Sequence, residues 1–459
     1  MSDPRIVIIG AGPTGLGAGY RLQEVGHEDW VILEANDYVG GLATSFTDEA
    51  GFTYDIGGHV MFSHYPYYDE LVEKLMGGEY TELQREAWVW MEDRFIPYPF
   101  QNNIRDLEPQ TVFDCVQGLI EAQRAGRSYE NFAEWVDAIF GGGIAKHFML
   151  PYNFKVWATP AELMNYVWIG ERVSVVNVET ILRNVILGDD QVSWGPNNTF
   201  RYPLRNGTGH LYEGLRGYVE PNLHLETPVV SVEPRSKEVR TGDGRVWPYD
   251  VLLSTMPLNR LVACTEGVPD VVRRAAGDLV WSGSHIVGVG LDRPAHSTKN
   301  WIYFPEPEIP FYRVTYLSNY SPYITPERDQ TLLLTETSTS TFKPEDPSTI
   351  TDRVIDGLVA TGLMDDSDRQ LVVTTWLCSP GMSYPVPSTK RDAALGVIQP
   401  WLRSQDIWSR GRFGAWLYEI GNMDHSAMQG VEFVDHVLAG DAETVWIPRG
   451  EGDAGASVH

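Results

Sequence analysis

The segment from Arg5 to Leu42 decides the fold of this chain. Its informative stretches read R-I-V-I-I-G-A-G-P-T-G-L-G (5–17), V-I-L-E (31–34) and V-G-G-L (39–42). An apolar run typical of a buried strand leads into Gly10, Gly12 and Gly15, a G-x-G-x-x-G turn that opens a helical pattern. Glu34 ends the next apolar run. This order predicts a bound dinucleotide, with its pyrophosphate at the helix N-terminus and a ribose on the acid. The alternative is a plain strand–helix–strand turn.

A second glycine pair indicates which dinucleotide is bound. Gly40 and Gly41 follow the acidic residue closely, and glycine lets the backbone approach a ligand tightly. A pair at this place is typical of flavoproteins that bind FAD in an extended form, so we predict FAD. Taken alone, the pair is also compatible with an ordinary Gly-Gly turn.

The composition narrows the classes of partner. The chain has 459 residues, enough for two or three domains, and its 43% hydrophobic and 12% aromatic content suits sizeable cores. Its formal net charge is −27, which disfavours nucleic acid and anionic membranes as partners. An anionic substrate would therefore need a few local arginines that act against the overall charge.

Several features favour a cytoplasmic protein without a metal. Cys115, Cys264 and Cys378 are far apart and odd in number, which favours reduced thiols. The histidines lack the spacing of metal ligands, and no apolar run reaches the ~18 residues of a membrane span. A strand near residue 6 leaves no room for a signal peptide, and residues 451–459 are expected to form a flexible tail.

The remaining pattern predicts an α/β fold with a split Rossmann-like FAD-binding domain. The expected parts of that domain are 1–65, 205–275 and 405–450, with strands at 228–232 and 251–255. A mostly helical substrate and flap domain is expected at 66–204, where Gly141-Gly142-Gly143 should end a helix. A helix should start near Asp424 and direct its N-terminus at the electron-rich end of the flavin.

An antiparallel-sheet domain is expected at 276–404. Alternating apolar and polar residues predict its strands at 286–291, 313–317, 332–337 and 371–376. This domain would supply a second part of the substrate site.

Long blocks along nearly the whole chain resemble the eukaryotic-type UDP-galactopyranose mutases. The blocks are G-G-H-V-M-F-S-H-Y (57–65), P-Y-P-F-Q-N-N-I (97–104), P-Y-N-F-K-V-W-A (151–158), I-G-E-R-V (169–173), W-G-P-N-N-T-F-R-Y-P (194–203), F-Y-R-V-T-Y-L-S-N-Y-S-P-Y (311–323), S-Y-P-V-P (383–387) and G-R-F-G-A-W-L-Y-E-I-G-N-M-D-H-S (411–426). They occur in the family's order and are rare in composition.

The resemblance implies which residues hold the substrate. A diphosphate calls for guanidinium groups, and Arg172 and Arg313 match the family's diphosphate clamp and its catalytic arginines. Taken singly, either arginine would more often form a surface ion pair, and Tyr98 and Phe148 would more often be core aromatics. The positions that match the family's diphosphate, uridine and hexose contacts are Arg85, Tyr98, Gln101, Phe148, Asn153, Trp157, Asn197, Trp301, Tyr303, Tyr384, Tyr418 and Asn422.

The resemblance also implies the flavin neighbours. His59 follows the Gly57-Gly58 pair on a loop that meets the flavin in this family and responds to its redox state; a satisfied polar histidine in a turn is the alternative. His64 is expected at the surface. Arg172 and Asn197 lie in segments that are mobile flaps in the family. The further positions that match cofactor contacts are Gly58, Val230, Arg412, Asn422 and Met423.

The implied activity is the interconversion of UDP-galactopyranose and UDP-galactofuranose, without net redox change, through a covalent bond between the sugar and N5 of reduced FAD. NADPH or NADH would reduce the flavin, and a homo-oligomer is compatible with the resemblance. Met423, Leu417 and His210 depart from the family pattern, which bears on the identity of the sugar. The alternatives are the same mechanism on another nucleotide sugar, a flavin amine oxidase or desaturase, and a catalytically inactive nucleotide-sugar-binding protein.

Overall fold

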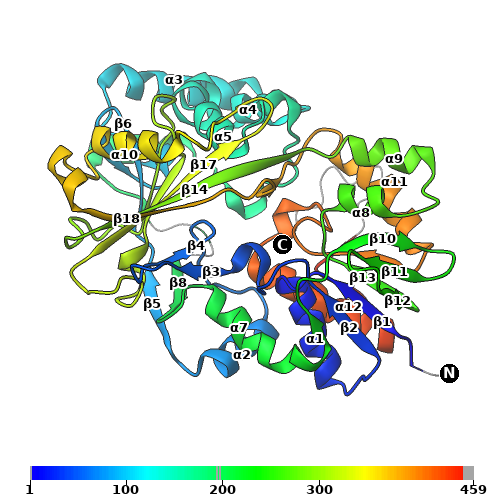
Figure 1. Cartoon of the computed structure of the whole chain (residues 1–459). Helices are drawn as coiled ribbons and strands as arrows, with labels where there is room; N and C mark the ends of the chain where they lie inside the picture. The colour runs from blue at the N-terminus through cyan, green and yellow to red at the C-terminus, as the bar shows by residue number, and fades with distance from the viewer. Residues whose placement is uncertain (1–2, 193–194, 196–197, 448–459) are drawn as a thin grey trace.

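The glycine fingerprint lies at the centre of a parallel sheet. The computed structural model describes residues 3–192, 195 and 198–447. Strand β1 (Ile6–Ile9) is completely buried and pairs in parallel with its neighbours on both sides. The sheet order is β20 (Ile407–Ser409), β13 (Val251–Ser254), β1, β2 (Trp30–Leu33) and β9 (Leu223–His224). Segments from three distant parts of the sequence therefore form one Rossmann-like sheet (Figure 1).

Small residues bring the helices of this layer close together. Helix α1 (Pro13–Glu24) lies against α12 (Met423–Ala439) and α7 (Gly209–Val219). A Cβ on Gly430 would overlap the carbonyl oxygen of Thr14, and one on Gly17 would lie 2.6 Å from the carbonyl oxygen of Ala427. The close approach holds the N-terminal turns of α1 in a fixed place beside the C-terminal segment of the chain.

Shorter elements complete this part of the molecule. The expected strand near 228–232 is confirmed as β10, which opens an antiparallel sheet at one end of the parallel sheet. The elements are β10 (Val229–Glu233), β11 (Glu238–Thr241), β12 (Val246–Pro248), α8 (Leu258–Cys264), α9 (Asp270–Gly277) and α11 (Arg391–Arg403).

The second large sheet contains every strand that the alternating patterns predict. Its order is β18 (Val372–Cys378), β14 (Trp281–Leu291), β17 (Thr331–Thr339), β16 (Arg313–Tyr316), β15 (Trp301–Tyr303), β6 (Ala87–Met91) and β7 (Arg94–Pro97), and β19 (Tyr384–Pro385) pairs with β14. The pairings are antiparallel except that of β15 with β6, which is parallel. Helix α10 (Ile350–Ala360) covers one face.

A short hairpin covers the other face of that sheet. Strands β3 (Ser45–Thr47) and β4 (Thr53–Asp55) carry aromatic rings onto β14, where Gly288 and Gly290 leave room for them. A Cβ on Gly290 would lie 2.8 Å from the ring of Phe52, and one on Gly288 would overlap the ring of Tyr54. Tyr54 also stacks on Trp376 with 4.9 Å between ring centroids.

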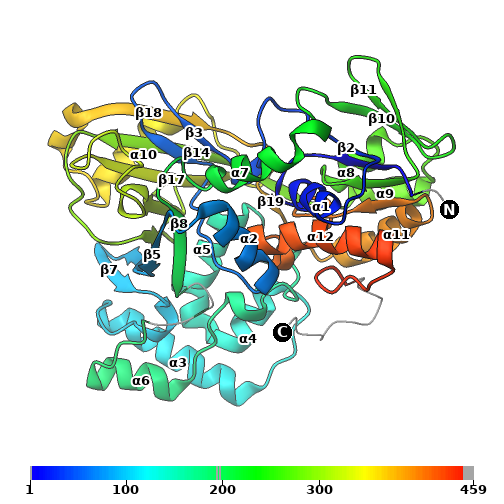
Figure 2. The same cartoon turned by 90° about the horizontal axis from the view of Figure 1, so that it is seen from below.

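The insert at 66–204 is mostly helical but differs from the expectation in one respect (Figure 2). It contains strands, and two of them, β6 and β7, extend the large sheet. Residues 87–89 of β6 pair with β15, β7 pairs with β6, and Val89, Trp90 and Met91 are buried. Its elements are α2 (Pro66–Met76), β5 (Tyr80–Gln84), α3 (Pro109–Ala125), α4 (Phe132–Ile144), α5 (Leu150–Trp157), α6 (Val178–Leu187) and β8 (Thr199–Pro203).

The triglycine interrupts a helix, as expected, because Gly141 has non-helical backbone angles within α4. Gly141 has φ +73° and kinks α4, and a π-helical turn (Ala145–Met149) then connects α4 to α5. A Cβ on Gly141 or Gly143 would overlap the backbone of α3 near Gly118 and Asp114. The glycines therefore serve close helix packing. None of the helices among the described residues combines the length and the apolar character needed to cross a membrane.

Candidate flavin and substrate site

The glycine turn forms a cradle at the N-terminus of α1. Gly10 has φ +100°, and a Cβ there would overlap the hydroxyl of Thr255; a Cβ on Gly15 would overlap the carbonyl oxygen of Gly10. Both glycines are required by packing of the protein itself. Gly12 differs, because no described atom lies within 4 Å of the Cβ position. The open space in front of Gly12 faces the first turn of the helix, where a pyrophosphate would be held.

The second glycine pair and the acid border the same space. Gly41 has φ +54°, and its Cβ position lies 3.5 Å from Cα of Gly12, while Gly40 donates its N–H to the carbonyl oxygen of Ala11 at 2.8 Å. Glu34 is buried and accepts the N–H of Ala11 at 2.7 Å, so its carboxylate is fixed at the end of β2. These residues fit an extended FAD with a ribose at Glu34.

Val230 lies on β10 and is exposed. The strand begins next to Glu34, because Thr227 donates its N–H to the carbonyl oxygen of Glu34 at 2.7 Å. A contact between Val230 and the cofactor stays a prediction.

The helix expected near Asp424 is confirmed, since α12 begins at Met423 with extended Asn422 as its N-cap. The guanidinium of Arg172 donates to the carbonyl oxygen of Glu419 at 2.8 Å and to Oδ1 of Asn422 at 3.5 Å. The carboxylate of Glu419 itself pairs with fully buried Arg391 at 2.9 and 3.0 Å. The positive end of α12 and the Arg172 side chain therefore lie together.

A second guanidinium completes a cationic wall. Arg412 donates to the carbonyl oxygens of Ser383 at 3.0 Å and Gly421 at 3.1 Å. Arg412 and Arg172 lie over the ring of Tyr418 at 5.6 and 5.1 Å, and Arg412 lies 5.0 Å from the ring of Tyr384. Among the described residues, neither of these two arginines forms an ion pair with a carboxylate. Their charge is free to meet an anionic ligand.

Arg313 is held differently, by a carboxylate that the sequence reasoning missed. Its Nε donates to Oε1 of Glu336 at 2.6 Å, and Glu336 also accepts the Tyr312 hydroxyl at 2.6 Å and the Gly58 N–H at 3.0 Å. Burial alone would raise the pKa of Glu336, but the charge of Arg313 and these hydrogen bonds hold that pKa below its ordinary value. Glu336 is the lone acid in the leucine- and threonine-rich strand 331–339, and this is a sequence signal that could have found it.

His59 lies between these groups. Its Nδ1 is buried and has no hydrogen-bond partner in the described part of the chain. Burial lowers the pKa of His59 to about 4, the nearby Glu336 works against this shift, and Arg412 and Arg313 add to it. The imidazole is therefore neutral at pH 7.

The loop that carries His59 is anchored at its far end by Asp424. This carboxylate is buried, accepts the backbone N–H of His64 at 3.1 Å and lies 2.7 Å from its Nδ1 and 3.1 Å from Nδ1 of His425. His64 is exposed, as expected, and is also tied to α12. The three side chains offer ligand atoms within 4.8 Å of one another, but hydrogen bonding alone accounts for the cluster, and the absence of a metal stays a prediction.

Aromatic side chains form the opposite wall. The rings of Tyr98 and Tyr303 are 5.3 Å apart, Arg85 lies 5.4 Å above Tyr98, and Trp301 donates its indole N–H to the Tyr303 hydroxyl at 2.8 Å. Tyr152, which the sequence reasoning did not single out, contacts Tyr303 at 5.3 Å. The Tyr384 hydroxyl lies 3.2 Å from the hydroxyl of Tyr312, which donates to Glu336.

The expected uridine contacts lie deeper. Phe148 is stacked between Phe100 and Tyr152, with centroids 4.5 and 5.2 Å away. Gln101 donates to the carbonyl oxygen of Ser174 at 2.5 Å, which leaves its buried Oε1 without a partner in the described chain.

Two further side chains that were predicted to contact the substrate already have partners within the protein. Asn153 donates to the carbonyl oxygen of Met149 at 2.8 Å. Trp157 is 1% exposed and contacts Trp168, Tyr384 and Tyr418, so it supports the wall from behind. Asn197 lies outside the described residues.

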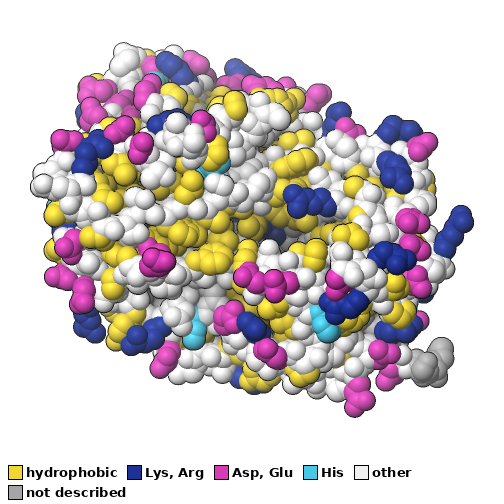
Figure 3. All heavy atoms as spheres, in the orientation of Figure 1, with side chains coloured by type: hydrophobic (Ala, Val, Ile, Leu, Met, Phe, Trp, Pro, Cys, Tyr) yellow, Lys and Arg dark blue, Asp and Glu magenta, His cyan; other side chains and the backbone are white. Residues whose placement is uncertain are grey.

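The departures from the family pattern fit this protein's packing. Leu417 is 4% exposed in the core of the parallel-sheet layer, and half-buried Met423 packs on the same core. His210 lies at the start of α7 with Nδ1 3.4 Å from the Asn206 amide. Figure 3 shows a hollow near the middle of the molecule, bordered by many hydrophobic side chains.

Comparisons with known proteins agree with this geometry. Residues 13–413 match the family model "Flavin containing amine oxidoreductase". A crystal structure of reduced UDP-galactopyranose mutase is 43% identical, with a TM-score of 0.94 over 97% of this chain and 96% of that chain.

Curated relatives match over short segments only. A 15-cis-phytoene desaturase of Glycine max is 40% identical over 70 residues, which are 15% of this chain and 12% of the desaturase. An L-amino acid oxidase of Cerastes cerastes is 32% identical over 137 residues, 26% of each chain. The chain thus spans about a quarter or less of these two relatives.

The fold, the glycine cradle and the family match define a class: this chain belongs to the flavin-containing amine oxidoreductases. Within that class, the full-length similarity confirms the expected membership of the UDP-galactopyranose mutases. The α/β fold with a split FAD-binding layer is confirmed by the same similarity.

Proposed function

We propose that this chain interconverts UDP-galactopyranose and UDP-galactofuranose. The observation that carries the proposal is the cationic wall: Arg172 and Arg412 lie over the ring of Tyr418 beside the N-terminus of α12, without carboxylate partners in the described chain. In a chain of net charge −27, such arginines are best explained by an anionic ligand. The similarity to a UDP-galactopyranose mutase supports a UDP-sugar.

The arginines would stabilise the diphosphate as the sugar leaves it. Arg172 and Arg313 approach from different elements, so a diphosphate between them would be held from two sides. Negative charge grows on the departing UDP, and fixed guanidinium groups stabilise that charge more strongly than water does. Arg412 and the hydroxyls of Tyr384 and Tyr418 would add to this cradle.

FAD is the cofactor that the glycine cradle and the family support. The chemistry that reduced FAD supplies when bound is a nucleophilic N5 for the anomeric carbon, after reduction by NADPH or NADH. Neutral His59 and the Gly57–Gly58 backbone would line the flavin, and Glu336 would fix Gly58 relative to Arg313. Because the His59 imidazole is neutral, we propose that its loop orients the reactants and does not supply a proton.

The aromatic wall would hold the rest of the substrate and exclude water. Tyr98, Phe148 and the free Oε1 of Gln101 suit a flat base with an N–H donor, whereas Trp301 and Tyr303 suit a hexose. Exclusion of water protects the sugar while it is detached from UDP.

The curated relatives raise a second candidate, an oxidase or desaturase. They match this chain over short segments only. An apolar substrate would leave the charges of Arg172 and Arg412 buried against it, which is costly. The cationic wall therefore favours a nucleotide sugar.

One experiment separates these functions. The purified protein is incubated with UDP-galactopyranose without oxygen, before and after dithionite reduction, and the nucleotide sugars are separated by chromatography. We expect conversion only after reduction, and a borohydride-type trap of the turnover mixture should yield a flavin-linked hexose. An inactive reduced protein, or conversion by the oxidised form alone, would contradict the proposal. Parallel incubation with other UDP-hexoses tests the alternative sugar.

A further inference from the structure

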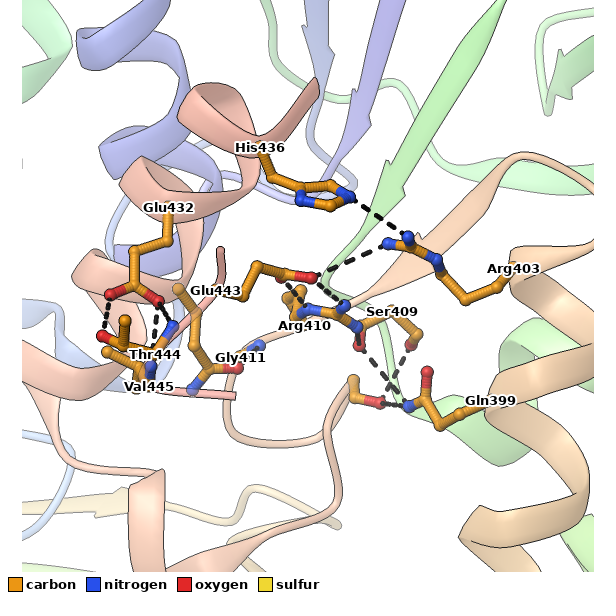
Figure 4. Close-up of polar contacts among 12 residues, drawn as sticks. Gln399, Arg403, Ser409, Arg410, Gly411, Glu432, His436, Glu443, Thr444 and Val445 are labelled. Atoms are coloured by element: carbon orange, nitrogen blue, oxygen red, sulfur yellow. Dashed lines mark hydrogen bonds and ion pairs between the residues drawn. The ribbon is translucent and has the colours of Figure 1, made fainter. Parts of the chain in front are cut away.

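The C-terminal segment is fastened across the FAD-binding layer. Residues 441–447, here called the C-terminal strap, follow α12 and turn back along it (Figure 4). The carboxylate of Glu432 on α12 accepts the N–H groups of Thr444 at 2.7 Å and Val445 at 2.9 Å, and the Thr444 hydroxyl at 2.5 Å. The strap is therefore held in one place relative to α12.

The strap carries the carboxylate that neutralises a completely buried arginine. Arg410 has no exposed side-chain area, and its Nε and Nη2 donate to the two oxygens of Glu443 at 2.6 and 2.8 Å. The ring of Trp446 covers the guanidinium at 3.7 Å. Arg403 lies 3.7 Å from the same carboxylate, and Glu443 is the acid that pairs with Arg410 among the described residues.

This arrangement makes the position of Arg410 depend on the strap. A buried guanidinium without its carboxylate is strongly unfavourable, because neither water nor a counter-charge replaces the lost partner. If Glu443 lost its charge, the Arg410 side chain would have to move toward water, and the backbone at residue 410 would move with it.

The backbone at Arg410 is the start of a tight turn that contacts both the cofactor cradle and the substrate wall. A Cβ on Gly414 would overlap the carbonyl oxygen of Arg410, so the turn has little freedom. Gly411 has φ +83°, donates its N–H to Gln429 at 2.8 Å, and leaves its Cβ position 2.5 Å from the hydroxyl of Thr14 in the first turn of α1. Arg412 is the next residue, and its guanidinium belongs to the cationic wall.

We propose that Glu443 is a positioning residue, which acts through Arg410 to hold the turn at 410–414 against the first turn of α1. The strap thereby fixes the position of Arg412 relative to the pyrophosphate cradle. This inference rests on the proposed binding of FAD and a UDP-sugar, but not on the reaction that follows.

Glu443→Gln in the full chain tests the proposal, because it keeps the shape of the side chain and removes its charge. We expect FAD release from the folded holoprotein to accelerate, and the Kd for UDP to rise, each on the order of tenfold. The kcat should change less than KM. Asp441→Asn, an exposed position on the same strap, is the matched control and should stay within about twofold of the original protein.

A double variant gives the decisive comparison. Arg410→Gln combined with Glu443→Gln removes both charges, so FAD release and UDP affinity should recover toward the original values. A strap that only adds general stability would lower the unfolding temperature of Glu443→Gln while leaving FAD release and UDP affinity unchanged, and that result overturns the proposal. Since both readouts are binding measurements, absence of mutase activity in the original protein would contradict the proposed function and leave this test intact.

Discussion

At the scale of single residues, the site combines two arginines that have no carboxylate partner among the described residues with one arginine that is paired with a carboxylate. Arg172 and Arg412 are supported by carbonyl oxygens and aromatic rings, whereas Arg313 is fixed by Glu336. The first two can turn toward a ligand, and Arg313 keeps one geometry. We infer that Arg313 contributes chiefly to the transition state, where a preorganised charge has its largest effect.

Arg313→Ala should lower kcat by an amount that corresponds to about 2–4 kcal/mol, the scale of one lost electrostatic donor. Steady-state kinetics of the reduced enzyme give the value. Arg240→Ala, which removes a surface arginine paired with Glu233, is the control and should leave kcat unchanged. Nearly full turnover by Arg313→Ala would remove this residue from the site.

His59 predicts a dependence of stability on pH. Its folded pKa of about 4 lies below the unfolded value of about 6.5, so the unfolded state binds more protons between these values, and stability falls as the pH drops from 6.5 to 4. Buried Asp55, with its pKa raised to about 6, acts in the opposite direction over part of this window. Urea unfolding of the original protein and His59→Gln isolates the histidine, since the loss on acidification should be smaller in the variant. If both proteins lose the same stability on acidification, the folded pKa of His59 is not lowered and the prediction is wrong.

At the scale of elements, the N-termini of α1 and α12 face the same region and are joined by the close contact of Gly17 and Gly430 with the opposite helix. One helix end suits the pyrophosphate and the other suits the electron-rich end of a reduced flavin. Their fixed spacing explains why segments four hundred residues apart, 12–15 and 422–425, act together.

Gly12→Val should abolish FAD retention without unfolding the protein. The new side chain would fill the open space in front of α1. Apart from its neighbours in the chain and the adjoining helix backbone, no described atom lies within 4 Å of the Cβ position, so the valine would clash with the ligand and not with the protein core. Flavin absorbance after gel filtration, together with circular dichroism, tests this. A folded variant that is replete with flavin would contradict the assignment of the cradle.

Asp424→Asn should free the His59 loop from α12. The carboxylate accepts hydrogen bonds from both the backbone and the ring of His64, and loss of a buried charged acceptor costs about 1–3 kcal/mol. We expect a lower unfolding midpoint and faster proteolysis within 57–65, measured by limited digestion and mass spectrometry. Asp435→Asn, at a half-exposed pair with Arg21 later on the same helix, is the comparison.

Sequence reasoning succeeded where the signal is local. The fingerprint, the alternating strands of the second sheet and the start of α12 are each specified by neighbouring residues, and the structure has them. It failed where partners are distant: Gly58 meets Glu336 across 278 residues and His64 meets Asp424 across 360. Strands β6 and β7 were missed for the same reason, since β6 is explained by its pairing with distant β15 and β7 by its pairing with β6. The substrate roles, which come from resemblance, await experiment.

At the scale of the whole molecule, the candidate site draws residues from the parallel sheet, the second sheet and the helical insert. Ligands should therefore stabilise the chain as a unit. FAD at 100 times its Kd should add about 2.7 kcal/mol to the free energy of unfolding, and UDP should raise the unfolding temperature further in the same single transition. Calorimetry of the apo, FAD-bound and doubly liganded protein tests this, and a transition that splits in two would contradict it.

The aromatic rings of Phe52 and Tyr54, seated over Gly288 and Gly290 of β14, have a consequence for how this enzyme can vary. The same hairpin leads directly into Gly57, Gly58 and His59. A methyl group added at Gly288, on a strand that carries no predicted ligand contact, would lift the hairpin and displace the loop above it. Gly288 and Gly290 should therefore tolerate substitution less well than their distance from the nucleotide suggests. Substitutions at these positions should change the absorbance and the redox behaviour of the bound flavin.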